Sequence, residues 1–369
     1  MRKLTTKIQK FNIDKDKRVI VIGDIHAHTS YLKNLLIKTN FSNKDELFLI
    51  GDYIERGTNN LECLRYVMEL SKKPNIHTIL GNNDAFIFTA INEPTKYDAN
   101  MLFNYIQNRL KWFDACTITD MCKEIGIALE KESDVVPVLT KLKENFSEEQ
   151  DFIFSLPTII DTQNFTFVHG GLTDAKLENC ESQNPFNLMK NDEFLTKSIF
   201  FNKFVVVGHW PTILYKQIQD CSPIFDFEKK ILSIDGGCGV KTCGQLNALI
   251  IENNQSENFS FVSYDELEKF IADKNQEESP QNINILWGKN EIKVLENNGD
   301  LSYIYHVQSE RTAYIPSDLI FKEGKIYKSD DFSDYKLSVK KGDELAFIDY
   351  KKGFGKLVKK DSTIGWYNP

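Results

Sequence analysis

Five short segments of this 369-residue chain place carboxylate, amide or imidazole side chains beside glycine. The first contains Asp24 and His26, a carboxylate and an imidazole two residues apart, which together look like half of a metal site. The others are Gly51-Asp52, Gly81-Asn82-Asn83-Asp84, His169-Gly170-Gly171 and Gly208-His209. A single segment of this kind would mean little, whereas five of them indicate one composite site.

Each of these segments directly follows an apolar run that predicts a buried strand. The runs cover residues 19–22, 46–50, 76–80, 165–168 and 204–207. Their β-branched and aromatic side chains suit strands that are covered on both faces. Because open α/β sheets bind ligands outside the carboxyl ends of their strands, we expect the polar side chains to meet at one edge. Helical leucine spacing over 31–38 and 61–70 predicts helices that cover one sheet face.

In their order, the five segments resemble the calcineurin-like metallophosphoesterases, whose pattern reads GDxH, GDxxDRG, GNH followed by E or D, HGG or HAG, and GH. The resemblance extends over roughly residues 19–250. The segments 231–239 and 246–251 look like the closing strands of the bacterial serine/threonine protein phosphatase and diadenosine tetraphosphatase branch. The cyclic-nucleotide phosphodiesterase branch has a second histidine as GHxH, where this chain has Pro211. The resemblance implies an α/β fold with a β-sandwich flanked by helices.

Carried onto this sequence, the family pattern implies two divalent metal ions. Asp24 and His26 would bind one ion, and Asp52 would bridge both. Oxygen and imidazole ligands without a thiolate suit Mn, our first expectation, or Fe or Zn. A metal-bridging hydroxide would attack phosphorus in line. The remaining ligands, all for the second ion, would be Asn82, His169 and His209.

The implied catalytic set departs from the family pattern at the leaving group. Arg56 offers a planar, permanently charged fork for phosphate oxygens. In the family, a histidine acts as general acid and an aspartate orients it, but this chain has Asn83 and Glu55 there. An amide cannot deliver a proton, and general acid catalysis is worth about 10²–10⁴ in rate. Either Asp84, Glu55 or His28 acts as the acid, or the leaving groups of the substrates need no proton. The sequence therefore predicts that Asn83→His raises the turnover of an alkyl monoester.

Three functions compete on this basis. The first is a phosphoesterase that hydrolyses phosphate monoesters, similar to serine/threonine protein phosphatases. The second is a phosphodiesterase or dinucleotide pyrophosphatase on the same site, and the missing histidine motivates it. The third is a weakly active metal-containing module that binds a partner, although retention of Arg56 and all six ligands argues against it. The expected partners are a phosphorylated protein or nucleotide as substrate and a peptide at the C-terminal domain.

The sequence predicts a metallophosphoesterase domain over residues 1–272, a polar linker over 273–284 and an all-β domain over 285–369. A mainly helical insertion spans about residues 90–151, and in the resembling family such insertions cap the active site. A capping pattern of Ser263 and Glu266 predicts one short helix over 264–272. The C-terminal segment is similar to a bacterial SH3-like barrel in its Val-x-x-Gly-Asp turn and its final Gly-Trp-Tyr. Trp366 and Tyr367 would either form the floor of a peptide groove or pack in the core.

Composition and charge narrow the class of protein further. With 41% hydrophobic and 12% aromatic residues, the chain can bury packed cores. A net charge of -8 argues against binding nucleic acid through its phosphates. The N-terminal segment lacks the apolar core of a signal peptide, and no run approaches membrane-spanning length. Seven cysteines without a CxxC pair predict reduced thiols in a cytoplasmic protein without a membrane partner.

Overall fold

A computed structural model describes residues 2–369 and divides the chain into two compact units. The first unit contains the residues up to Pro211 together with Pro223–Asp265. The second contains Thr212–Ser222 and Glu266–Pro369. The first unit thus ends before residue 272, where the sequence placed the end of the first domain, and the excursion at Thr212–Ser222 has no counterpart in the predicted division.

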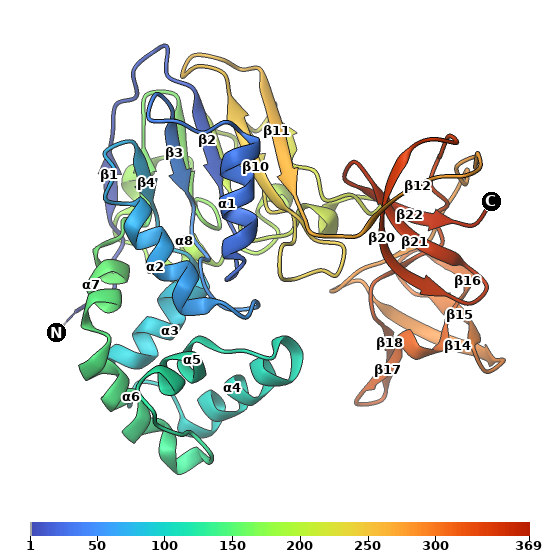
Figure 1. Ribbon diagram of the computed structural model, residues 1–369, viewed down its shortest axis with the longest axis horizontal. Helices are drawn as coiled ribbons and strands as arrows, with labels where there is room; N and C mark the ends of the chain where they lie inside the picture. Colours follow the sequence, from blue (N-terminus) through green and yellow to red (C-terminus); the bar gives the residue numbers. More distant parts are fainter. Residues whose placement is uncertain (1) are drawn as a thin grey trace. The chain divides into compact units, whose positions relative to one another are not determined.

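Two sheets form the centre of the first unit (Figure 1). The five-stranded sheet has the order β11-β10-β2-β3-β4, in which β2, β3 and β4 are mutually parallel. The six-stranded sheet has the order β1-β5-β6-β7-β9-β8. The strands of the first sheet are β2 (Val19–Ile22), β3 (Glu46–Leu49), β4 (Ile76–Thr78), β10 (Leu246–Ile251) and β11 (Phe259–Tyr264). Those of the second are β1 (Ile8–Lys10), β5 (Ile159–Asp161), β6 (Phe165–Val168), β7 (Phe204–Val207), β8 (Ile224–Asp226) and β9 (Ile231–Ser233).

The alternation of side chains along β2 shows how the layers pack. Val19 and Val21 belong to the core between the two sheets, where Phe48 stacks on Phe167 with ring centroids 4.0 Å apart. Ile20 belongs to the other core, between the five-stranded sheet and the helices. Successive residues of a strand point to opposite faces, so an all-apolar strand covers both cores. The predicted β-sandwich flanked by helices is confirmed.

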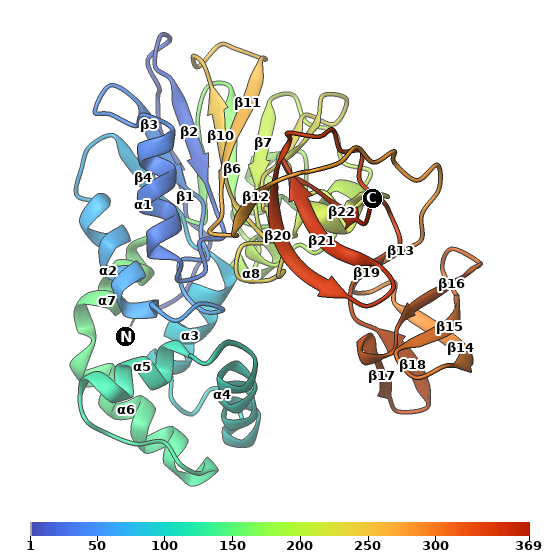
Figure 2. The ribbon, with the colours of Figure 1, turned by 45° about the vertical axis from the view of Figure 1, so that its right-hand side comes forward.

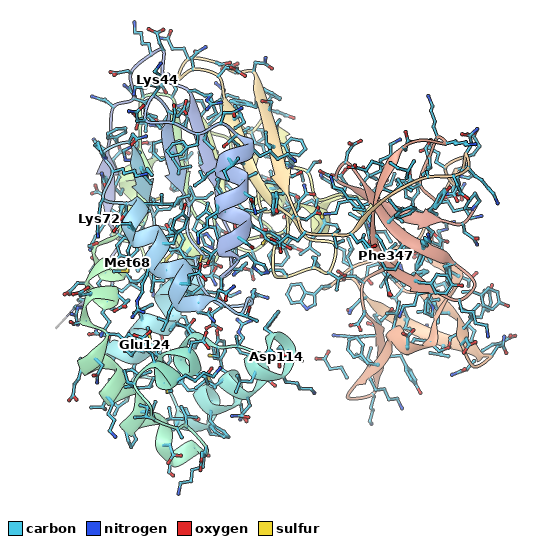
Figure 3. The ribbon with its side chains drawn as sticks, viewed as in Figure 1. Lys44, Met68, Lys72, Asp114, Glu124 and Phe347 are labelled. Carbon is cyan, nitrogen blue, oxygen red and sulfur yellow. The ribbon has the colours of Figure 1, made fainter. Side chains whose placement is uncertain are left out.

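Helices cover the outer face of the five-stranded sheet and one end of the unit (Figures 1 and 2). The two predicted helices are α1 (Thr29–Lys38) and α2 (Asn60–Leu70). The others are α3 (Asn82–Asn92), α4 (Ala99–Phe113), α5 (Thr117–Glu124), α6 (Val135–Asn145), α7 (Ser147–Ser155) and α8 (Pro185–Met189). Arg65 of α2 binds both carboxylate oxygens of Glu124, labelled in Figure 3, at 2.7 and 2.8 Å, and so ties α5 to the body of the unit. None of the helices in residues 2–369 is long and apolar enough to cross a membrane.

The second unit is built from strands, as the sequence predicts, and has two small cores. One core surrounds Leu345 and Tyr367, and the other surrounds Ile304 and Trp366. The terminal aromatics therefore pack in the cores, which is the second of their two predicted roles. The strands are β12 (Lys269–Ile271), β13 (Asn284–Ile285), β14 (Glu291–Asn297), β15 (Leu301–His306), β16 (Arg311–Pro316), β17 (Ile320–Glu323), β18 (Ile326–Ser329), β19 (Phe332–Ser333), β20 (Glu344–Lys351), β21 (Gly355–Lys360) and β22 (Thr363–Tyr367).

The predicted helix over 264–272 is wrong. Ser263 lies inside β11, opposite Asn247 of β10, and β12 follows after a short loop. β12 pairs with β20 through Phe270 and Leu345, which are far apart in the sequence. This distant pairing overrides the local helix signal, because intrinsic propensity is only a weak prior.

Candidate metal centre

The loops after β2 and β3 bring Asp24, His26 and Asp52 to one edge of the sheet. Ile22 lies opposite Leu49 in parallel register, so the two strands end together. The backbone amide of His26 donates to the carbonyl of Asp52 (2.9 Å). Asp24, His26 and Asp52 have positive φ angles of 57°, 49° and 54°. This left-handed conformation costs a non-glycine residue about 1–3 kcal/mol and persists only where the surroundings enforce it.

The side chains of Asp24, His26 and Asp52 form a buried group that fits a metal ion. One ligand atom from each lies within 4.8 Å of the others. Oδ2 of Asp24 is buried and has no hydrogen-bond donor among residues 2–369. A Cβ at position 208 would lie 2.0 Å from this oxygen, so Gly208 allows the close approach. A buried carboxylate without a partner is costly, and a cation at this place would remove the cost.

His169 adds a ring nitrogen that faces the same carboxylates. Its Nδ1 lies 2.8 Å from the carbonyl of Ile50, so Nδ1 carries a proton and donates it there. Its Nε2 lies 3.1 Å from Oδ1 of Asn82, 3.4 Å from Oδ1 of Asp52 and 4.0 Å from Oδ1 of Asp24. A neutral ring in this tautomer would aim its lone pair at three acceptor oxygens. A divalent cation among these four atoms would turn that repulsion into coordination.

His209 follows β7 and is oriented by a carboxylate that the sequence did not indicate. Its φ is 67°, and its backbone amide donates to Oδ1 of Asp24 (2.9 Å). Its Nε2 lies 2.7 Å from Oδ1 of Asp192. This contact leaves Nδ1 as the ring nitrogen available to a cation, and a histidine that binds a metal usually donates its other ring N–H to a carboxylate, a backbone carbonyl or a water. Asp192 lies in a polar region without a strand-end signal, so sequence reasoning missed it.

The electrostatics of the group show its need for positive charge. Burial and the charge of Asp235 raise the pKa of Asp24 well above its ordinary value. Burial would also raise the pKa of Asp52, but the charge of His169 outweighs it and lowers that pKa. Burial opposes protonation of His169, yet Asp52 and Asp24 raise its pKa to about 10. Burial lowers the pKa of His26 to about 3. The raised pKa of His169 shows that the buried carboxylates of Asp52 and Asp24 favour a positive charge beside them.

Asp235 and Asp84 are further buried carboxylates around the group. Asp235 follows β9 and accepts from the amide of Gly237 (2.7 Å). The run 231–234 ends in Asp-Gly-Gly, the same signal as in the other segments, so the sequence offered Asp235 and our reasoning did not use it. Asp84 accepts from the amides of Asp52 (2.9 Å) and Tyr53 (3.0 Å). Its side chain thus holds the loop after β3, and burial together with Asp52 raises its pKa to about 7.

Glu55 points towards helices α4 and α5, which lie in the segment that the sequence predicts as a helical insertion. It is fully buried and accepts hydrogen bonds from the amide of Thr117 (2.9 Å) and the hydroxyl of Tyr105 (2.9 Å). Nε of Arg109 lies 3.2 Å from its Oε2. The sequence suggested Glu55 as an acid or as the partner of one. In the structure, Glu55 connects the loop after β3 to helices α4 and α5.

Asn83 lies between helix α4 and the group of Asp24, His26 and Asp52, which we call the metal group. Its Nδ2 donates to Oδ2 of Asp52 (2.5 Å), and its backbone amide donates to the other oxygen (2.9 Å). Its Oδ1 accepts from Nη2 of Arg109 (3.3 Å). Arg109 therefore belongs to the site, and no local pattern could have shown it, because only the packing of α4 brings it there.

Arg56 and His28 are the last two of the catalytic candidates that the sequence predicts. The guanidinium of Arg56 lies 5.9 Å from the ring centre of Phe113 on α4, and its Nε is buried without a hydrogen-bond partner in residues 2–369. Nδ1 of His28 lies 2.6 Å from the carbonyl of His26. The structure thus places Arg56 beside the insertion and engages one nitrogen of His28 in a backbone contact.

Comparison with known families settles the class of this fold. A family model described as calcineurin-like phosphoesterase matches residues 17–236, more than half of the chain. The chain is a calcineurin-like phosphoesterase. It thereby belongs to a family of hydrolases that act on phosphoester bonds with divalent metals, and its buried Asp-His-Asp group fits that use.

Several individual proteins are similar to this phosphoesterase. A symmetrical bis(5'-nucleosyl)-tetraphosphatase from Actinobacillus pleuropneumoniae is 42% identical over 19% of the chain and 26% of its own length. One from Haemophilus ducreyi is 26% identical over 42% of the chain and 44% of its own length. The chain thus spans less than half of these relatives. A serine/threonine phosphatase structure from Saccharomyces cerevisiae has a TM-score of 0.41 at 14% identity, over 71% of this chain and 84% of that one.

Proposed function

We propose that this phosphoesterase uses two divalent ions to hydrolyse phosphate monoesters whose leaving groups need no proton. The observation that carries the proposal is the buried group of Asp24, His26 and Asp52. The ring nitrogen Nε2 of His169 also faces the carboxylate oxygens of Asp24 and Asp52. When bound, two such ions supply an activated water and neutralise charge at phosphorus. The protein supplies the ligands and the groups that hold the substrate.

The proposed ligands divide between the two ions as the family pattern implies. Asp24 and His26 would hold one ion, and Asp52 both. Asp192 would fix the ring of His209, and Asp84 would hold the backbone beneath Asp52, so both are positioning residues. The remaining ligands of the second ion would be Asn82, His169 and His209.

The phosphate and its leaving group would meet different side chains. Arg56 would bind phosphate oxygens, since its guanidinium is charged at all working pH values and its Nε has no partner in residues 2–369. Asn83 would face the leaving group but cannot protonate it. Aryl phosphates and other substrates with acidic leaving groups therefore fit this site better than phosphoserine.

A second candidate is a dinucleotide pyrophosphatase acting at the same site. The named relatives, both symmetrical bis(5'-nucleosyl)-tetraphosphatases, favour it, and so does the departure at Asn83. The leaving group of such a substrate is a nucleotide phosphate, which departs as a stable anion. A peptide partner of the second unit, its SH3-like nature and a cytoplasmic location stay predictions.

The test compares 4-nitrophenyl phosphate, bis-4-nitrophenyl phosphate and a bis-nucleosyl tetraphosphate with purified protein supplied with Mn²⁺. Asp52→Asn serves as the blank, and Asp16→Asn, at an exposed turn, serves as the matched control. Faster turnover of the monoester supports the proposal, and faster turnover of the tetraphosphate supports the second candidate. Turnover no higher than in the blank would refute both.

A further inference from the structure

Helix α4 brings a second arginine next to Asn83, the position at which the resembling family has its proton donor. Arg109 contacts Asn83 through Nη2 (3.3 Å) and Glu55 through Nε (3.2 Å). Asn83 in turn donates to the carboxylate of Asp52. The guanidinium is thus two contacts away from the metal group, and its side chain is only 11% exposed.

Arg109 and Arg56 form a pair of cations around one aromatic ring. Their guanidinium carbons lie 5.4 and 5.9 Å from the ring centre of Phe113, and Arg109 also lies 4.8 Å from the ring of Tyr105. Glu55 is the one carboxylate in ion-pair contact with Arg109 within residues 2–369. Two largely buried like charges repel, so an anionic ligand between them would be favoured. A phosphate with a departing oxygen has two anionic ends, one for each arginine.

We propose that Arg109 acts as a catalytic residue that stabilises the leaving oxygen by its positive charge, in place of a proton. The bond between phosphorus and the leaving oxygen breaks, and both electrons stay on that oxygen. A new bond forms between phosphorus and the oxygen of water, whose proton passes to solvent. The leaving anion is held against the guanidinium until a solvent proton neutralises it. Preorganised donors of this kind are worth about 10²–10³ in rate.

The inference rests on the proposed function, so wild-type turnover above that of Asp52→Asn is measured first. The test then compares a series of aryl phosphates with increasingly basic leaving groups, ending with phenyl phosphate. For Arg109→Ala we expect a loss of about threefold with 4-nitrophenyl phosphate and of about 10²–10³ with phenyl phosphate. Arg109→Lys keeps a charge and should recover part of the loss with the basic leaving groups.

Two variants separate this role from a structural one. Lys111→Ala removes an exposed charge from the same helix and should change no rate. Tyr105→Phe removes one hydrogen bond to Glu55 without changing charge and should leave the dependence on the leaving group as in wild type. Metal content and melting temperature are measured on every variant, so that loss of metal or of folding is recognised.

The outcomes distinguish the two proposals. Losses that grow with the basicity of the leaving group, with partial recovery in Arg109→Lys, support the role of Arg109. Equal losses for all substrates, or no loss, would overturn it while leaving the proposed function intact. Wild-type turnover no higher than that of Asp52→Asn would overturn both.

Discussion

Replacing Glu55 with glutamine should loosen the helical insertion. The buried carboxylate accepts from the amide of Thr117 and the hydroxyl of Tyr105, and it pairs with Arg109. Glutamine keeps one acceptor oxygen for Thr117, but it places an NH2 group where the Tyr105 hydroxyl needs an acceptor, and it loses the negative charge that pairs with Arg109. Removing one partner of a buried ion pair costs about 3–5 kcal/mol, and we take about 3 kcal/mol as the loss in the free energy of opening.

Hydrogen-exchange mass spectrometry measures this loss where it occurs. Peptides from α4 report the opening of that helix alone, whereas peptides from β2 and β3 report the stability of the sheet. Since 1.36 kcal/mol corresponds to about a tenfold change, a loss of 3 kcal/mol predicts about 150-fold faster exchange in α4. The exchange of β2 and β3 should stay close to that of wild type.

The matched control is Glu62→Gln. Glu62 pairs with Lys33 at 3.0 Å, and both side chains are about half exposed, so this ion pair contributes little. The control should change exchange in α4 by less than about threefold. An equally small change in Glu55→Gln would show that apolar packing alone holds the insertion, and our reasoning about Glu55 would be wrong.

The remaining predictions concern the metal, the leaving group and an ion pair. Saturating Mn²⁺ at a hundredfold excess over Kd should stabilise the fold by about 2.7 kcal/mol, and Asp24→Asn should abolish the resulting shift in melting temperature. Asn83→His alone should not raise turnover of an alkyl monoester in steady-state assays, contrary to the prediction from sequence, because the carboxylate of Glu55 is engaged by the insertion. Asp45→Asn should cost about 1–2 kcal/mol at neutral pH in urea denaturation, because Arg18 binds Asp45 through two contacts of 2.9 Å. Burial opposes ionisation of Asp45, but Arg18 and Ser42 lower its pKa. The difference between Asp45→Asn and wild type should therefore disappear as the pH falls through that lowered pKa.

The metal group could be predicted from sequence because its geometry follows from local features. Asp24 and Asp52 lie in the loops that begin at the ends of the parallel strands β2 and β3, and the ends of neighbouring parallel strands meet at one edge. The predicted ligand His169 also follows its strand at once. Once the strands are assigned, the proximity of these side chains follows from the sequence. The same logic would have found Asp235 at the end of β9.

The residues that were missed or placed wrongly depend on packing between distant segments. Arg109 reaches Asn83 only because α4 folds back on the metal loops. Asp192 comes to His209 from an irregular segment. The strand β12, taken for part of a helix, owes its conformation to β20. No periodicity or short motif carries such information, so sequence reasoning was silent or wrong at these places.

One physical argument connects the two departures from the family pattern. A histidine at position 83 must be protonated to act as an acid, and it would then place a cation beside the guanidinium of Arg109. Two charges 4 Å apart repel by about 4 kcal/mol at an effective dielectric constant of 20. An uncharged amide avoids this repulsion and offers Oδ1 to Arg109. Glutamate at position 55, one methylene longer than aspartate, meets the same guanidinium. A histidine that donates a proton and an arginine that offers a positive charge are therefore alternative ways to stabilise the same leaving group. Asn83 and Glu55 are compatible with the arginine.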